Sequence, residues 1–274
     1  MALIDFEYDL PFNCMDDQNK ITSTRKPKWL IWLSAVVIGL ILLLLIIYLN
    51  IKSNLPDVTD LIKSNPKTTA LMQERLNQAK SAGKKLRIKQ DWVQFNQIPD
   101  LLKKSVRISE DANFYFHQGI DLEELEESIK KNFEKGEFAR GASTITQQLA
   151  KNLYLNTDKS LIRKIKEYFI AKYLEENLSK NRIFHIYLNI IELGHGIFGV
   201  AAASEYYFNI PVENLSNEEI IRLTAIIPRP LSVRADGNSK WLLWRCRWIT
   251  DKLLRYKYID QPEHQRLMLL FNSE

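Results

Sequence analysis

The stretch RGASTITQQLAKN, residues 140–152, decides the fold class of this chain. Within it, Thr144 and Gln147 have the spacing of a capping box, in which two side chains bond to each other's backbone N–H groups at a helix start. Apolar residues then recur at every fourth position from Ile145, which is typical of one buried helix face. The stretch therefore predicts an amphipathic helix that begins at Thr144 and packs against other helices.

Helical periodicity continues on both sides of this stretch, and strand signals are few. Ser216 and Glu219 form a second capping box before a helix that Pro228 ends. Only WVQF, residues 92–95, resembles a short strand. Further helices are expected at residues 121–135, 159–178, 181–192 and 240–258. The chain is therefore expected to form one mostly α domain, with helices packed on helices.

A continuous apolar run, WLIWLSAVVIGLILLLLIIYL, occupies residues 29–49 and carries no charge. At about 1.5 Å per residue, a helix of this length spans the roughly 30 Å hydrocarbon core of a bilayer. Arg25, Lys26 and Lys28 crowd its N-terminal side, whereas only Lys52 is close on the other side. By the positive-inside rule, a single membrane-spanning helix with a cytoplasmic N-terminus is expected.

The apolar run also predicts how the chain is divided. We expect a cytoplasmic tail (1–28), a transmembrane helix (29–49), a linker lying over the surface (50–68) and a folded domain outside the cytoplasmic membrane (69–274). Cys14 and Cys246 then lie on opposite sides of the bilayer and cannot pair.

The composition limits the class of protein. Hydrophobic residues make up 46% and charged residues 26% of the chain, which excludes a disordered chain and a polytopic membrane protein. Two cysteines and four histidines argue against a disulfide scaffold and a His-rich or thiolate-based zinc site. The net charge of +5 suits an anionic partner: a membrane surface, a phosphate group or a nucleic acid.

The segment SEDANFYFHQG, residues 109–119, carries the first candidate site. It sets the adjacent carboxylates Glu110 and Asp111 among Phe114 and His117. A carboxylate among aromatic groups is desolvated, which raises its pKa from about 4.3 and suits a general base. The same pattern also fits an exposed acidic turn before a helix.

The helix start at Thr144 is the second candidate site. Small residues before it allow close approach to a ligand, and its free N–H groups could bind an anion. Gln148, Lys151 and Asn152 lie away from the apolar stripe. An ordinary capped amphipathic helix would show the same features.

The third candidate is RKIKE, residues 163–167. Arg163 and Lys164 lie four and three residues before Glu167, so the three side chains share a helix face. Two cations beside one carboxylate could hold a diphosphate or a metal–diphosphate pair. A solvated salt bridge is the alternative.

Four motifs in this order carry a family resemblance. They are ED-x-x-F-x-x-H-x-G from Glu110, GASTITQQ from Gly141, RK-x-x-E from Arg163, and SK-x-x-I-x-x-x-YLN from Ser179 with a following G-x-G-x-x-G. Residues 55–254 resemble the peptidoglycan glycosyltransferases of glycosyltransferase family 51. The lack of a following transpeptidase domain is similar to the monofunctional biosynthetic transglycosylases.

The resemblance implies a lysozyme-like helical fold with two lobes. It also implies polymerisation of lipid II, the undecaprenyl-diphosphate-linked disaccharide-pentapeptide, into β-1,4-linked glycan strands with inversion and release of undecaprenyl diphosphate. Such an enzyme would serve cell-wall synthesis and cell shape from the inner membrane, with its catalytic domain in the periplasm. The implied partners are lipid II, the growing glycan, the membrane, transpeptidases and proteins of division or elongation, but no nucleic acid.

The resemblance also implies roles for individual residues. Glu110 would be the general base, and Glu167 would assist on the donor side by orienting the diphosphate or its Mg²⁺ or Mn²⁺ ion. The cations that would neutralise the leaving diphosphate are Lys151, Arg163 and Lys164. The residues that would line the donor site are Thr144, Gln147, Gln148 and Asn152. The pocket around Glu110 would be shaped by Asp111, Phe114 and His117.

The chain departs from the family pattern at two places. His185 stands where the family usually has glutamate, and it is expected to support the fold. Near the C-terminal motif, Arg229 stands where asparagine is common, and Arg245 and Arg247 match the basic pair approximately.

Two alternative functions remain open at this point. A lytic transglycosylase or lysozyme-like hydrolase shares a helical fold and a catalytic glutamate, but it has no diphosphate for Lys151 and the Arg163–Lys164–Glu167 group to hold. A non-catalytic membrane-anchored scaffold for cell-wall enzymes would not need both candidate carboxylates.

Overall fold

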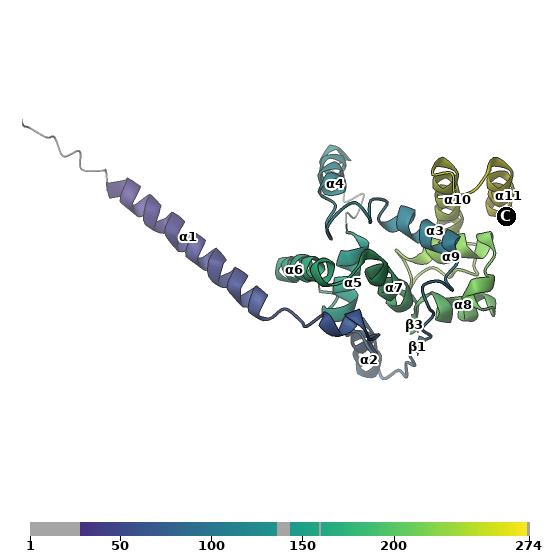
Figure 1. Ribbon diagram of the computed structural model, residues 1–274, viewed down its shortest axis with the longest axis horizontal. Coiled ribbons are helices and arrows are strands. Elements are labelled where there is room, and N and C mark those ends of the chain that lie inside the picture. The colour runs from purple at the N-terminus through teal and green to yellow at the C-terminus, as the bar shows by residue number, and fades with distance from the viewer. Residues whose placement is uncertain (1–27, 136–142, 159, 273–274) are drawn as a thin grey trace, which may run out of the picture. The chain divides into compact units, whose positions relative to one another are not determined.

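The computed structural model describes residues 28–135, 143–158 and 160–272 (Figure 1). The chain divides into a compact unit of residues 1–50 and another of residues 51–274. Most of the predicted tail and the small residues Gly141 and Ala142 lie outside the described residues.

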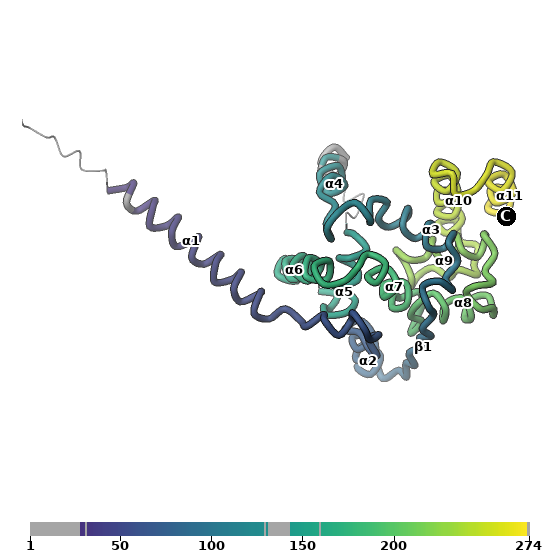
Figure 2. Tube along the Cα trace, in the orientation of Figure 1, coloured from purple at the N-terminus to yellow at the C-terminus, as the bar shows by residue number. Residues whose placement is uncertain are grey.

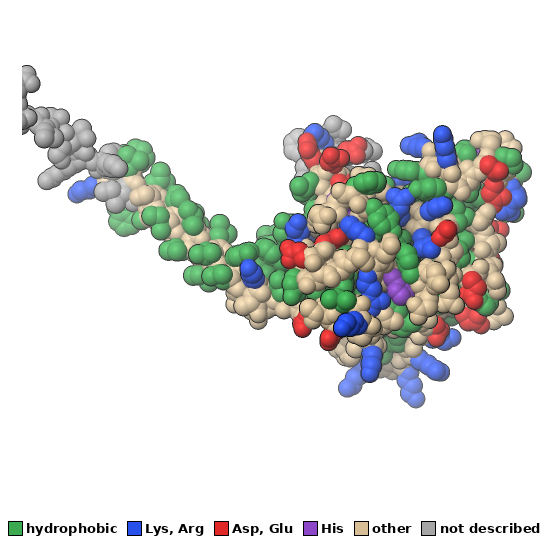
Figure 3. Space-filling model, in the orientation of Figure 1, with side chains coloured by type: hydrophobic (Ala, Val, Ile, Leu, Met, Phe, Trp, Pro, Cys, Tyr) green, Lys and Arg blue, Asp and Glu red, His purple; other side chains and the backbone are tan. Residues whose placement is uncertain are grey.

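The first unit is dominated by α1 (Lys28–Ser53), which contains the whole predicted apolar run. Among the described residues, it is the one helix long and apolar enough to cross a membrane, with a mean hydropathy of 3.2. Hydrophobic side chains cover its length (Figure 3). Every large hydrophobic side chain in residues 36–47 is exposed. Exposed leucines and isoleucines in such number require apolar surroundings, so α1 is a candidate membrane anchor.

The second unit is mostly helical, as predicted. The Cα trace in Figure 2 follows its helices from the anchor to the C-terminus. They are η1 (Thr59–Ile62), α2 (Ala70–Ser81), α3 (Asp100–Glu110), α4 (Leu122–Lys135), α5 (Ile145–Tyr154), α6 (Leu161–Asn177), α7 (Lys180–Ile190), α8 (Val200–Phe208), η2 (Val212–Asn214), α9 (Asn217–Ile226), α10 (Lys240–Arg255) and α11 (Gln261–Asn272). Helices α3, α9 and α10 pack together (Figure 1), and α5 packs on α2, α6 and α7.

A small sheet joins the segment before α3 to the segment between α7 and α8. Its order is β1 (Lys89–Gln90), β3 (Ile197–Phe198), β2 (Glu192–Gly194), with β1 parallel and β2 antiparallel to β3. The predicted strand at 92–95 is wrong, because β1 covers only Lys89–Gln90 and ends two residues before Trp92. The Val93 N–H group instead donates to the Asn189 side chain at 2.9 Å.

The hydrophobic core is centred on α5 and α7. Residues 183–190 of α7 are all buried, as expected for a helix that other elements surround. Val58 and Leu61, within the segment expected to lie over the surface, are buried in the same core. Cys246 of α10 is also fully buried.

The helix ends follow local chemistry. The capping boxes predicted at Thr144 and Ser216 are both formed. Helix α7 ends at Ile190, two residues before the predicted end, because Glu192 enters β2. Helix α10 ends at Arg255, and Lys257 follows in the left-handed conformation with a φ of 58°.

Candidate active site

A pocket of about 680 Å³ lies between the C-terminal end of α3, the start of α5 and one face of α10. Its polar lining includes Ser109, Glu110, Asp111, Asn113, Asp121, Glu124, Ser143, Thr144, Gln148, Lys151, Arg245 and Lys252. A larger depression of about 790 Å³ on α2 contains none of the candidate site residues. Because the smaller pocket brings together residues of two of the three candidate sites, it is the candidate active site.

Glu110 is the last residue of α3, and its side chain is only 10% exposed. Its Oε2 atom accepts a hydrogen bond of 3.2 Å from the Gln148 amide, and its Oε1 atom lies 3.3 Å from the Ser109 hydroxyl and 3.5 Å from Arg245 Nη2. Burial raises the pKa of Glu110 above its usual 4.5, although the charge of Arg245 opposes this shift. The alternative of an exposed acidic turn is therefore wrong, and Glu110 has the environment of a general base.

The Gln148 amide is oriented by a buried tyrosine. Tyr187 of α7 is fully buried, and its hydroxyl donates to Gln148 Oε1 at 2.9 Å. This bond turns the amide NH₂ group of Gln148 toward Glu110. The sequence contained Tyr187 within the YLN motif, but nothing in the pattern indicated this contact.

Helix α10 supplies the pocket wall opposite α5. Arg245 donates to Ser109 Oγ at 2.8 Å, and Lys252 donates to the Ile108 carbonyl at 2.9 Å. Both cations flank the ring of Trp248, at 4.1 and 4.0 Å from its centroid. Sequence reasoning matched Arg245 only approximately and missed Lys252 and Trp248. Their alternation of aromatic and basic residues at helical spacing was the available signal.

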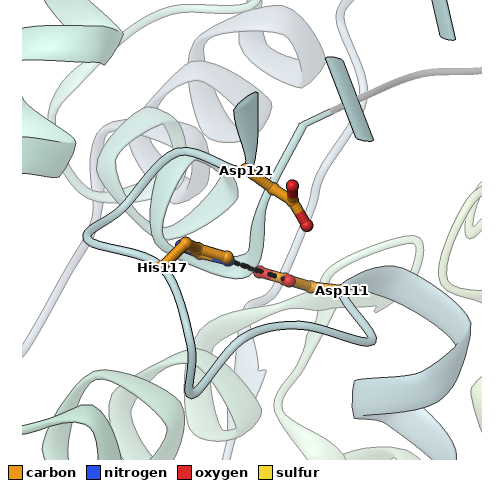
Figure 4. A group of neighbouring side chains, drawn as sticks. All are labelled: Asp111, His117 and Asp121. Carbon is orange, nitrogen blue, oxygen red and sulfur yellow. Dashed lines mark hydrogen bonds and ion pairs between the residues drawn. The ribbon is translucent and has the colours of Figure 1, made fainter. Parts of the chain in front are cut away.

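Contacts of Asp111 and His117 stabilise the loop after α3. His117 Nε2 lies 3.0 Å from Asp111 Oδ1 (Figure 4), and Asp111 Oδ2 accepts the Ile145 N–H group at 2.9 Å. Phe114 is fully buried and contacts the ring of Phe184 at 5.5 Å. Of the residues expected to shape the pocket, Asp111 therefore lines it, whereas Phe114 and His117 are not among its lining residues.

Thr144 and Gln147 hold the start of α5. The Thr144 hydroxyl accepts the Gln147 N–H group at 3.1 Å and donates to the Gly119 carbonyl at 2.6 Å, while Gln147 Oε1 accepts the Thr144 N–H group at 3.0 Å. Thr144 lines the pocket, but the structure does not place Gln147 or Asn152, both buried, in its lining.

The Arg163–Lys164–Glu167 group lies beside the pocket. The Glu167 side chain is 3% exposed and accepts bonds from Arg163 Nη1 at 2.6 Å and from Lys164. The carboxylate of Glu167 is thus buried within its two ion pairs, whereas the Lys164 side chain is 43% exposed. Lys164 also donates to pocket residue Ser143 at 3.0 Å.

Lys151 interacts electrostatically with Glu167 from within the pocket. It lines the pocket, burial lowers its pKa, and the charge of Glu167 partly restores that pKa. Glu110, Lys151 and Ser143 line the pocket, whereas Glu167 does not. Glu167 is linked to the pocket through Lys164, which donates to both Glu167 and Ser143.

The departures from the family pattern fall into two groups. His185 lies 2.8 Å from the Val93 carbonyl and 3.2 Å from Arg182 Nη1, away from the pocket lining. Arg229 packs over the ring of Trp241 at 4.6 Å, and Arg247 donates to the Phe271 carbonyl at 2.6 Å. Of the approximate basic pair, only Arg245 reaches the pocket.

The site thus combines a buried carboxylate, whose pKa burial raises, with neighbouring cations in a mostly helical domain. The transglycosylase family matches residues 77–254, so the chain belongs to this family and is a glycosyltransferase.

Relatives support this assignment. The chain is 38% identical to the biosynthetic peptidoglycan transglycosylase of Janthinobacterium sp. (strain Marseille), and 40% identical to that of Herminiimonas arsenicoxydans, over 83% of this chain and 94% of each relative. It is 39% identical to the protein of the same name from Nitrosospira multiformis, over 69% of this chain and 82% of that relative.

Proposed function

We propose that the chain is a peptidoglycan glycosyltransferase that joins the disaccharide units of lipid II into β-1,4-linked glycan strands and releases undecaprenyl diphosphate. The observation that carries the proposal is the buried carboxylate of Glu110, which shares one pocket with Lys151 and Arg245. The names of the relatives support peptidoglycan as the product.

In the proposed reaction, Glu110 accepts the proton of the acceptor's 4-hydroxyl group while this oxygen attacks the anomeric carbon of the lipid-linked donor. The new C–O bond forms on the face opposite the diphosphate, so an α-linked donor gives a β-linkage. The anomeric C–O bond breaks, and its electron pair leaves on the diphosphate. Lys151, and Lys164 beside Ser143, are placed to stabilise the developing negative charge.

The side chains around Glu167 do not fit the divalent cation that the family resemblance implies. Its two carboxylate oxygens already bond to Arg163 and Lys164, so a metal ion there would face two positive charges. The donor atoms of Asp111, His117 and Asp121 lie within 4.8 Å of one another (Figure 4). The two aspartates, however, accept the N–H groups of Ile145, Asn113 and Glu124. The proposal therefore assigns charge neutralisation to protein cations and includes no metal step.

The proposal puts α1 in the inner membrane, the N-terminus in the cytoplasm and residues 51–274 in the periplasm. This orientation follows from the basic residues before the apolar run. Transpeptidases and proteins of division or elongation are the partners expected there. Protease added to spheroplasts should digest residues 51–274, and protection of that unit would reverse the proposed orientation.

The deciding experiment incubates the full chain in detergent micelles with lipid II, with and without a chelator. We expect long glycan strands and free undecaprenyl diphosphate in both conditions. Shortening of preformed strands without growth would instead identify a cleaving enzyme. Complete loss of product with chelator would contradict the assignment of charge neutralisation to protein cations.

A further inference from the structure

A second groove of about 630 Å³ lies on the other side of the loop that follows α3. It is lined by α3, by this loop and by the turn after α10. None of the residues assigned above to the reaction lines it. The groove is large enough for a sugar and its substituents, since small-ligand sites typically measure about 300–1,000 Å³.

Aromatic rings form one wall of this groove. The rings of Tyr256 and Tyr258 are nearly parallel, with an interplanar angle of 20° and centroids 6.0 Å apart. Tyr256 is 44% exposed, so one of these rings is open to solvent. The electron-rich face of an aromatic ring attracts the slightly positive C–H bonds on the flat side of a sugar ring.

The turn that carries these tyrosines has an uncommon backbone. Lys257, between them, has a φ of 58°, a left-handed conformation that glycine usually occupies after a helix. Arg107 fixes the second ring by donating to the Tyr258 hydroxyl. The Arg107 bond thus holds the Tyr258 ring on the groove wall, and the turn at Lys257 brings Tyr256 onto the same wall.

The groove is also basic. Its described lining contains Lys103, Lys104 and Arg107 but a single acidic residue, Asp100, which pairs with Lys103 at 2.7 Å. The Lys104 ammonium lies 5.0 Å from the centroid of the Tyr258 ring. A ligand that spans the tyrosines would therefore bring a carboxylate close to Lys104.

The groove adjoins the catalytic pocket. Ala112 and Asn113 line both, so the two sites meet at one point of the same loop. A glycan that crosses this loop on leaving the catalytic pocket would meet the aromatic groove. This proximity and the positive charge favour one ligand, a glycan segment with a carboxylate-bearing peptide.

We propose that this groove binds a peptide-bearing disaccharide of the glycan, with a sugar stacked on Tyr256 and a peptide carboxylate paired with Lys104. The inference rests on the proposed function, because that function supplies the polymer. It adds a binding site outside the pocket in which the glycosidic bond forms.

The test titrates the full chain in detergent micelles with a soluble disaccharide-peptide obtained by muramidase digestion of peptidoglycan. We expect Tyr256→Ala and Lys104→Gln each to raise the Kd at least fivefold. With a probe whose peptide carboxylates are amidated, Lys104→Gln should bind like the wild type, whereas Tyr256→Ala should still bind more weakly. Two control variants, Tyr206→Ala at a ring of similar exposure (41%) and Lys85→Gln, should leave the Kd unchanged.

The outcomes separate the two proposals. If the wild type polymerises lipid II but does not bind the probe, or binds it with the same Kd in all variants, the groove is not a glycan site. If the wild type fails to polymerise lipid II but binding still depends on Tyr256 and Lys104, the groove stands and the proposed function fails. Should Tyr256→Ala not fold, the Lys104→Gln comparison of the two probes still decides.

Discussion

The carboxylate of Glu110 meets two opposing influences. Burial disfavours its charged form and raises its pKa, whereas Arg245, at 3.5 Å, favours the charged form. The first influence is the larger, so the folded protein holds a group that accepts a proton more readily than an exposed glutamate. This reactivity has a cost in stability once the group ionises.

Replacing Glu110 by glutamine tests both consequences. We expect Glu110→Gln to lower the rate of glycosyl transfer by about 10²–10⁴-fold, the usual contribution of a general base. Well below pH 4.5 the carboxyl group is neutral in the folded and unfolded chains. As the pH rises above 4.5 the unfolded chain ionises first, so the free energy of unfolding of the wild type should fall relative to the variant. Unfolding in denaturant at several pH values checks the sign, and a relative rise would contradict the desolvated carboxylate.

Arg245 should set the acidic limb of the pH–rate profile. Without its charge, the pKa of Glu110 would rise further, so Arg245→Ala should move the acidic limb of kcat/KM to higher pH. Arg245→Lys should give a smaller shift, and Arg247→Ala is the matched control because Arg247 does not line the pocket. An acidic limb at the wild-type pH in Arg245→Ala would remove Arg245 from this role.

Tyr187 is a positioning residue in this account. Tyr187→Phe removes the hydroxyl that holds Gln148 Oε1, which frees the amide to turn its oxygen toward Glu110. The unfavourable contact of two acceptors should raise the pKa of Glu110 and lower kcat/KM about fivefold, since a net hydrogen bond is worth about 1 kcal/mol. A pH–rate profile separates this effect from a loss of stability, which would leave the acidic limb in place.

At the scale of elements, the start of α5 combines a cap with a buried contact. Thr144→Ala would remove the cap and leave the Gly119 carbonyl without its 2.6 Å donor, so we expect a loss of about 1–3 kcal/mol in the free energy of unfolding. Ser216→Ala removes the equivalent but exposed cap of α9 and should cost only about 0.5–1 kcal/mol. Equal losses in denaturant unfolding would show that the Gly119 contact contributes nothing.

How far the sequence predicted each element depended on the range of the interactions that form it. Capping boxes are local, so the starts of α5 and α9 were predicted correctly. Strand β1 depends on pairing between Lys89 and Ile197, which no local pattern encodes, and its prediction was wrong. Likewise the site motifs pointed to Glu110 and Lys151, whereas Lys252 reaches the same pocket from a distant helix.

At the scale of the whole molecule, residues 51–274 contain every described part of the hydrophobic core. We therefore expect deletion of residues 1–50 to release a folded unit that stays in the supernatant after ultracentrifugation, while the full chain sediments with membranes.

Within that unit, Leu61→Ala should lower the free energy of unfolding by about 2–4 kcal/mol, because Leu61 is buried in the core. Circular dichroism and thermal melting check both results, and an unfolded deletion product would contradict the division into two units.

The buried thiol of Cys246 has a practical consequence. Its burial raises its pKa to about 12, and only the thiolate form reacts readily with oxidants and alkylating reagents. Residues 51–274 contain no second cysteine. A cysteine introduced on their surface would be the single readily labelled sulfur of the unit, so a spin probe or fluorophore attached there could follow opening of the pocket during turnover.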